Sequence, residues 1–87
     1  MEVKDSIKAA MKEQKIVLGS RQVESMAKKS ELIMIIYASN IPENTKRDLK
    51  YYNKNFGIDI KMFTGNSRQL GEFCGKPFNV ITLGIKK

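Results

Sequence analysis

Histidine is absent from this 87-residue chain, and cysteine occurs once, as Cys74. Without an imidazole, histidine-based acid–base and nucleophilic catalysis are excluded. A single cysteine without histidine cannot assemble a conventional zinc site. It cannot form an internal disulfide either, which fits a reducing compartment such as the cytosol.

Long apolar runs and nucleotide-binding motifs are also missing. The longest apolar run, Leu32–Ala38, is far shorter than the ~20 residues of a membrane-spanning helix. The charged first five residues do not resemble a secretory signal. The pair Gly75-Lys76 lacks both the spacing of a phosphate loop and the Ser or Thr that follows it, and no dinucleotide fingerprint occurs. We therefore predict a protein that is not an enzyme, binds no cofactor or metal and does not enter a membrane.

Positive charge is what the chain has in excess. Sixteen Lys and Arg residues against nine Asp and Glu give a net charge of +7 and a pI near 9.7. Such a balance indicates a polyanionic partner, either nucleic acid or an acidic membrane, with solubility alone as the alternative reading. The length and the 41% hydrophobic content predict one globular domain, residues 1–87, with a modest core.

Hydrophobic periodicity predicts alternating helices and strands. Helices are expected at about 3–14, 20–29, 42–56 and 67–74, and strands at 16–18, 32–38, 58–63 and 78–85. This alternation predicts an α/β fold, a three-layer α/β/α sandwich with a four-stranded mixed sheet, although periodicity does not give the strand order. The run at 32–38 is typical of a strand covered on both faces. We expect Tyr52 to face the core and the adjacent Tyr51 to face outward.

Candidate binding residues gather where strands meet helices. Three junctions combine small or amide side chains with a helix start, whose free N–H groups suit a phosphate. They are Gly19-Ser20-Arg21, Ser39-Asn40-Ile41-Pro42 and Thr64-Gly65-Asn66-Ser67. The alternative is that these residues only form turns and caps. Arg21, however, is unfavourable near a helix start, and a bound anion would remove that conflict.

The residue types suit folded RNA better than regular DNA. Arg21 and Lys76 can contact phosphates, and Asn40 can donate and accept toward base edges. In the segment Gly75-Lys76-Pro77-Phe78, Phe78 either stacks on an unpaired base or opens the last strand as a core residue. We predict that these distant segments converge into one cationic rim.

Several short motifs, in order along the chain, resemble a known family. They are Val17-Leu18-Gly19-Ser20-Arg21, the stretch from Ile35 to Asn40 with Pro42, Leu49-Lys50-Tyr51-Tyr52, Gly65-Asn66-Ser67-Arg68-Gln69-Leu70-Gly71, and Cys74-Gly75-Lys76-Pro77-Phe78-Asn79-Val80. Together, over residues 16–85, they resemble the thirty-e family of archaeal and eukaryotic large-subunit ribosomal proteins, within the superfamily of kink-turn RNA binders.

The resemblance implies a three-layer fold whose edge grips a sharply bent internal loop of RNA. Position by position, Gly19 and Arg21 match the family's first contact loop, and Asn40 matches the asparagine after the second strand. Gly75, Lys76 and Phe78 match the turn before the last strand. Ser20, Pro42 and Pro77 complete the candidate set as their neighbours. The segment Arg21-Gln22-Val23-Glu24-Ser25 departs from the Gly-x-Asn-Glu pattern of relatives in RNA-guided modification particles.

The predicted function is a structural constituent of the large ribosomal subunit, in the cytoplasm, that stabilises a kink-turn in ribosomal RNA. Expected partners are that RNA and other ribosomal proteins, and the free protein is expected to be a monomer. One alternative is a kink-turn module of another ribonucleoprotein or of a regulatory RNA. Another, of a different class, is a basic adaptor that binds an acidic protein.

Overall fold

The computed structural model describes residues 3–87, and the elements alternate as predicted. Met1 and Glu2, the first two residues of the predicted domain and of the charged segment at its start, lie outside the described residues. The helices are α1 (Val3–Lys12), α2 (Ser20–Lys28), α3 (Glu43–Phe56) and α4 (Ser67–Phe73). The strands are β1 (Ile16–Leu18), β2 (Leu32–Tyr37), β3 (Asp59–Met62) and β4 (Thr82–Lys86).

The four strands form one mixed sheet in the order β1-β4-β2-β3. Strand β4 lies between β1 and β2 and is antiparallel to both, whereas β3 pairs with β2 in parallel. The mixed sheet is therefore confirmed, and the strand order, which periodicity left open, is now given. Placing the last strand in the middle buries it: Thr82, Leu83, Gly84 and Ile85 are all buried.

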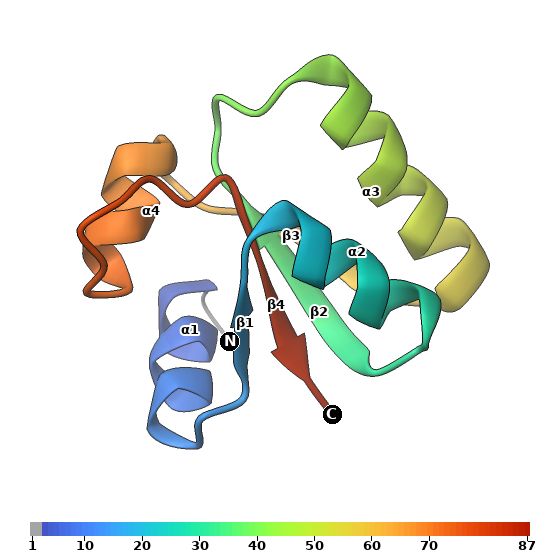
Figure 1. Cartoon of the computed structure of the whole chain (residues 1–87), viewed down its shortest axis with the longest axis horizontal. Helices are drawn as coiled ribbons and strands as arrows, with labels where there is room; N and C mark the ends of the chain where they lie inside the picture. Colours follow the sequence, from blue (N-terminus) through green and yellow to red (C-terminus); the bar gives the residue numbers. More distant parts are fainter. Residues whose placement is uncertain (1–2) are drawn as a thin grey trace.

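Helices cover both faces of the sheet, which confirms the three-layer α/β/α sandwich (Figure 1). On one face α2 packs against α3, and Val23, Leu49 and Thr82 line a small cavity between these helices and the sheet. On the other face α1 lies beside α4, where the Nζ atom of Lys8 is 5.8 Å from the ring centroid of Phe73. The apolar core between the layers excludes water and supplies most of the folding free energy.

The last strand is shorter than predicted. It begins at Thr82, not at Phe78, because residues 78–81 pack along α4 instead of entering the sheet. The Val80 N–H donates a 3.0 Å hydrogen bond to the carbonyl of Ser67, the first residue of α4. An N–H that donates to a carbonyl of the helix cannot also donate to a neighbouring strand.

Strand β2 is not covered on both faces along its whole length, as the sequence predicted. Ile33 is 50% exposed, and the pairing of β2 with β4 shifts between Leu32 and Met34. Such an irregularity locally breaks the inward and outward alternation of side chains. Met62, on the edge strand β3, is similarly 51% exposed.

The outer surface of α3 follows the prediction. Tyr52 is buried and Tyr51 is 54% exposed, as expected for neighbours on a helix with one covered face. Pro42 precedes the helix as its N-cap residue and does not occupy the first helical position, because α3 begins at Glu43.

Among residues 3–87, no helix is both long and apolar enough to span a membrane.

Candidate nucleic-acid interface

Three of the candidate loops leave the sheet at the same end. Leu18, the last residue of β1, pairs with Leu83, and Tyr37, the last residue of β2, pairs with Thr82 at the start of β4. The Ala38 N–H continues this contact with a 2.9 Å hydrogen bond to the Ile81 carbonyl. The loops that follow β1 and β2 and the loop that precedes β4 are therefore neighbours, at the upper edge of the sheet in Figure 1.

The first loop is the turn from β1 into α2. Gly19 has a φ of 97°, a left-handed conformation that is costly for residues with a side chain, and it serves as the N-cap of α2. Because glycine has no side chain, it cannot cap α2, and no side chain of the N-cap residue accepts a hydrogen bond from the N–H groups of the first turn, which begins at Ser20. Arg21 is exposed on this first turn. A bound anion would satisfy both the amides and the guanidinium.

Asn40, in the second loop, has a structural role that the sequence did not reveal. Its Oδ1 atom accepts a 2.9 Å hydrogen bond from the Ser67 N–H, and its Nδ2 atom donates to the Ser67 hydroxyl at 3.3 Å. The loop after β2 is held further by the Ser39 N–H, which donates to the Gly65 carbonyl at 2.9 Å. Asn40 therefore fixes the end of β2 to the start of α4 and keeps one amide N–H that these bonds do not use.

The third loop runs from Gly75 to Ile81 along α4 and carries the exposed aromatic. Phe78 is 55% exposed, which decides between its two predicted positions: it is not a core residue. Lys76 and Pro77 are also exposed, and both line, with Phe78, a polar pocket of about 270 Å³ on the side of α4.

Lys76 links this third loop to the first. It and Leu18, the residue before Gly19, line one pocket of about 280 Å³. The buried Cys74 lies in the same wall, and burial raises the pKa of its thiol, while the nearby Lys76 cation acts in the opposite direction. The predicted site residues thus occupy adjoining loops, with Gly19, Arg21 and Asn40 near the sheet end and residues 75–78 beside α4.

Helix α4 holds the third loop in place through residues that sequence reasoning did not select. A methyl group on Gly71 would lie 2.1 Å from the carbonyl oxygen of Phe78, so only glycine permits this close approach. The sequence did contain a signal for this contact. A glycine inside a helix is unfavourable by ~1 kcal/mol relative to alanine, so its presence indicates close packing against another segment.

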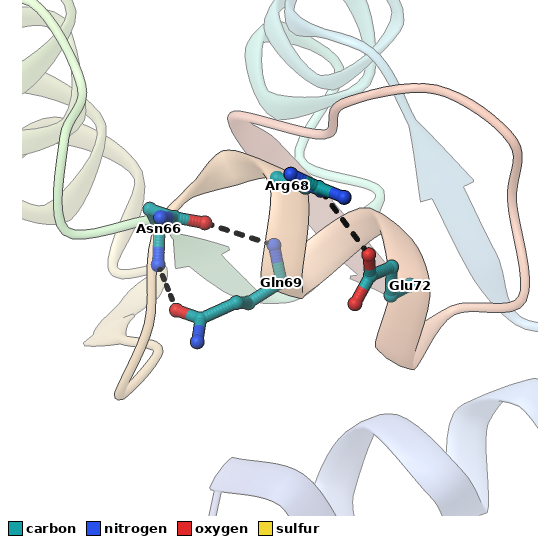
Figure 2. A network of polar contacts seen from close by, with 4 residues as sticks. All are labelled: Asn66, Arg68, Gln69 and Glu72. Atoms are coloured by element: carbon teal, nitrogen blue, oxygen red, sulfur yellow. Dashed lines mark hydrogen bonds and ion pairs between the residues drawn. The ribbon is translucent and has the colours of Figure 1, made fainter.

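The start of α4 is stabilised by a reciprocal cap (Figure 2). The Gln69 N–H donates to Asn66 Oδ1, and the Asn66 N–H donates to Gln69 Oε1, both at 2.9 Å. From the same first turn, Arg68 Nε lies 3.3 Å from Glu72 Oε1 on the exposed side of the helix.

Residues 3–87 contain no cluster of three or more His, Cys, Asp or Glu side chains that could hold a metal ion. The fold and the site define the class of protein: a small, basic α/β/α module with exposed cations, free helix N–H groups and an exposed aromatic ring on adjoining loops.

Comparison with known proteins places the chain within this class. Residues 1–87 match the model of the ribosomal protein L7Ae/L30e/S12e/Gadd45 family, and the chain belongs to that family. It is 36% identical over 86 residues to large ribosomal subunit protein eL30 of Methanothermobacter thermautotrophicus, covering 99% of this chain and 88% of that protein. It is 34% identical over 87 residues to eL30 of Methanosphaera stadtmanae, covering 100% and 89%. The resemblance to the thirty-e family is thus confirmed.

Two solved structures share the fold. The Giardia lamblia 15.5kD RNA binding protein superposes with a TM-score of 0.84 at 19% identity, over 98% of this chain and 71% of that one. A Bacillus halodurans protein of unknown function gives a TM-score of 0.82 at 23% identity, over 93% and 80%.

Proposed function

We propose that this protein is a structural constituent of the large ribosomal subunit, and that its single domain binds and stabilises a kink-turn in ribosomal RNA. The observation that supports the proposal is the meeting of three loops at one end of the sheet, since these loops carry Arg21, Asn40 and the segment 75–78. The relatives named as eL30 support the ribosomal role, the cytoplasmic location and the absence of enzymatic activity. Other ribosomal proteins would be its neighbours, and the free protein would be a monomer.

The cations supply affinity in this mechanism. Arg21 and Lys76 neutralise phosphates and release condensed counterions, which makes binding depend on salt concentration. The N–H groups at the start of α2 add contacts that need no rearrangement of the backbone, because Gly19 already holds the turn open.

Shape selection comes from the remaining groups. Phe78 stacks on a base that the bend exposes, and the unused N–H of Asn40 donates to a base edge. Ser20, Pro42, Gly75 and Pro77 shape the loops that present these groups. Regular duplex RNA exposes no such base, so it would gain only the phosphate contacts.

The test is titration of the protein into a kink-turn RNA and into a straight duplex of equal charge, at two salt concentrations. We expect tighter binding to the kink-turn at both. Lys76→Ala should weaken binding to both RNAs and reduce the salt slope by about one. Lys29→Ala, an exposed cation at the end of α2, is the matched control and should leave the slope unchanged. Equal binding to kink-turn and duplex would contradict the proposal and favour a basic adaptor.

Sedimentation tests the ribosomal part separately. The protein should travel with purified large subunits and remain bound at moderate salt. Kink-turn binding without sedimentation would instead assign the module to another ribonucleoprotein or to a regulatory RNA.

A further inference from the structure

The outer surface of α3 carries a second concentration of positive charge. Arg47, Lys50 and Lys54 are exposed at spacings of three and four residues, which places them on one side of the helix. None of the ion pairs formed within residues 3–87 involves any of the three. The acidic residues of α3 lie elsewhere: Glu43 pairs with Lys46 at 3.7 Å, and Asp48 lines the cavity shared with α2.

An exposed aromatic ring lies among these cations. Tyr51 is 54% exposed, and it is held by edge contacts with the rings of Tyr52 and Phe56, at centroid distances of 5.9 and 6.0 Å. The buried ring of Tyr52 and the half-buried ring of Phe56 therefore fix the orientation of the Tyr51 ring, which lies outside the core. A fixed, solvent-facing ring between cations is the arrangement on which single-stranded nucleic acid stacks.

A groove runs along the same helix on the side of the edge strand. It has a volume of about 240 Å³ and is lined by Tyr37, Lys46, Leu49, Lys50, Asn53 and Ile60. Its lining contains apolar side chains, two cations and no carboxylate. The groove is large enough for an unstacked base and has donors but no charged acceptors at its rim.

The spacing of the cations matches a polynucleotide backbone. Lys46, Lys50 and Lys54 recur every four residues, so they are ~6 Å apart along the helix axis. This spacing is comparable to the separation of successive phosphates in an extended strand. An acidic peptide would satisfy the charges but would make no use of the exposed Tyr51 ring as a stacking surface.

We propose that the outer face of α3 is a second RNA-binding surface, which holds a single-stranded segment through Lys46, Arg47, Lys50 and Lys54 with Tyr51 as a stacking platform. In Figure 1 this helix begins beside the loop after β2 and runs away from α4. It therefore binds RNA that the first site does not contact, and the protein joins two segments of the RNA.

The experiment uses the full chain and two probes: oligouridine, and a kink-turn RNA with and without a single-stranded extension. The wild-type protein should bind oligouridine, and the extension should increase affinity for the kink-turn RNA. Lys50→Ala combined with Lys54→Ala should remove that increase and lower the salt slope for oligouridine by about 1.4. Tyr51→Leu should weaken oligouridine binding at least about fivefold.

The matched control combines Lys12→Ala with Lys29→Ala, which removes two exposed cations that lie outside α3 and form no ion pair within residues 3–87. If this control weakens oligouridine binding as much as the α3 variant, only net charge matters and the proposal is overturned. Polyglutamate competing as well as oligouridine would also overturn it, in favour of an acidic protein partner. Because oligouridine contains no kink-turn, its binding tests the α3 surface even if the protein proves not to bind kink-turns.

Discussion

At the scale of single residues, Asn40 shows that a candidate RNA contact can also hold the fold together. Its carbonyl oxygen and one of its N–H groups are used by Ser67, 27 residues away along the chain. Most substitutions of Asn40 will therefore change both folding stability and RNA affinity, and a test of its role in binding needs a variant that keeps the bonds to Ser67.

Asn40→Asp separates them. The carboxylate still accepts the Ser67 N–H, and its charge is favourable at the start of α4, so we expect the folding stability to be retained. RNA affinity should fall by ~1–3 kcal/mol, because the donor toward a base edge is lost. Thermal unfolding and RNA titration measure the two quantities. Asn40→Ala is the comparison: it loses both Ser67 bonds and should cost about 1–2 kcal/mol of stability.

Gly71 tests whether α4 positions the aromatic loop. Gly71→Ala forces the backbone at Phe78 to move, since the new methyl group would lie 2.1 Å from its carbonyl oxygen. We expect a cost of about 1–3 kcal/mol in unfolding free energy and weaker RNA binding in the fraction that is folded. Ile7→Val, in the core under α1, is the control: it lowers stability by about 0.5–1.5 kcal/mol without touching the loop. Unchanged RNA affinity in the Gly71 variant would show that the loop position is not needed.

At the scale of elements, α4 depends on its cap because it is short. Seven residues form few internal hydrogen bonds, and the reciprocal pair Asn66 and Gln69 satisfies two N–H groups that the helix cannot. The exposed pair Arg68 and Glu72, drawn beside it in Figure 2, is screened by water and contributes little.

Two substitutions in α4 should therefore differ in effect. Asn66→Ala should lower the unfolding free energy by about 1 kcal/mol, whereas Arg68→Ala should change it by less than about 0.5 kcal/mol. Denaturant unfolding of both variants under the same conditions measures the difference. A larger effect at Arg68 than at Asn66 would contradict this account of the helix.

At the scale of the whole molecule, two buried groups link stability to alkaline pH. Burial raises the pKa of the Cys74 thiol and, with smaller contributions from Glu24, Asp48 and Tyr51, also that of the Tyr52 hydroxyl. In both cases the folded state binds its proton more tightly than the unfolded state. The stabilisation is complete below the unfolded pKa and is lost as pH rises through the folded pKa.

We therefore expect the unfolding free energy to decrease above about pH 9, where the unfolded thiol and then the unfolded phenol lose their protons. Unfolding titrations between neutral and alkaline pH measure the slope. Tyr52→Phe removes the tyrosine contribution and should flatten the upper part of the curve. A stability that rises over this range would contradict the assigned direction.

Local sequence patterns determined a large part of this protein. The order of helices and strands, the opposite orientations of Tyr51 and Tyr52 and the excess of positive charge all depend on composition or on residues within a few positions of each other. The family motifs lie in loops at strand ends, where residue type alone indicates a turn or a helix start.

Only the tertiary structure decided where those loops meet. Placing β4 between β1 and β2 brings residues 18, 37 and 82 to one end of the sheet, and no local period encodes that order. The stretch 78–81 has the pattern of a strand, but in the folded chain it packs along α4, where Gly71 allows the close approach and the Ser67 carbonyl accepts the Val80 N–H. The physical reason is that pairing between distant segments depends on contacts that exist only once the chain has folded, whereas periodicity reports only which side of an element is apolar.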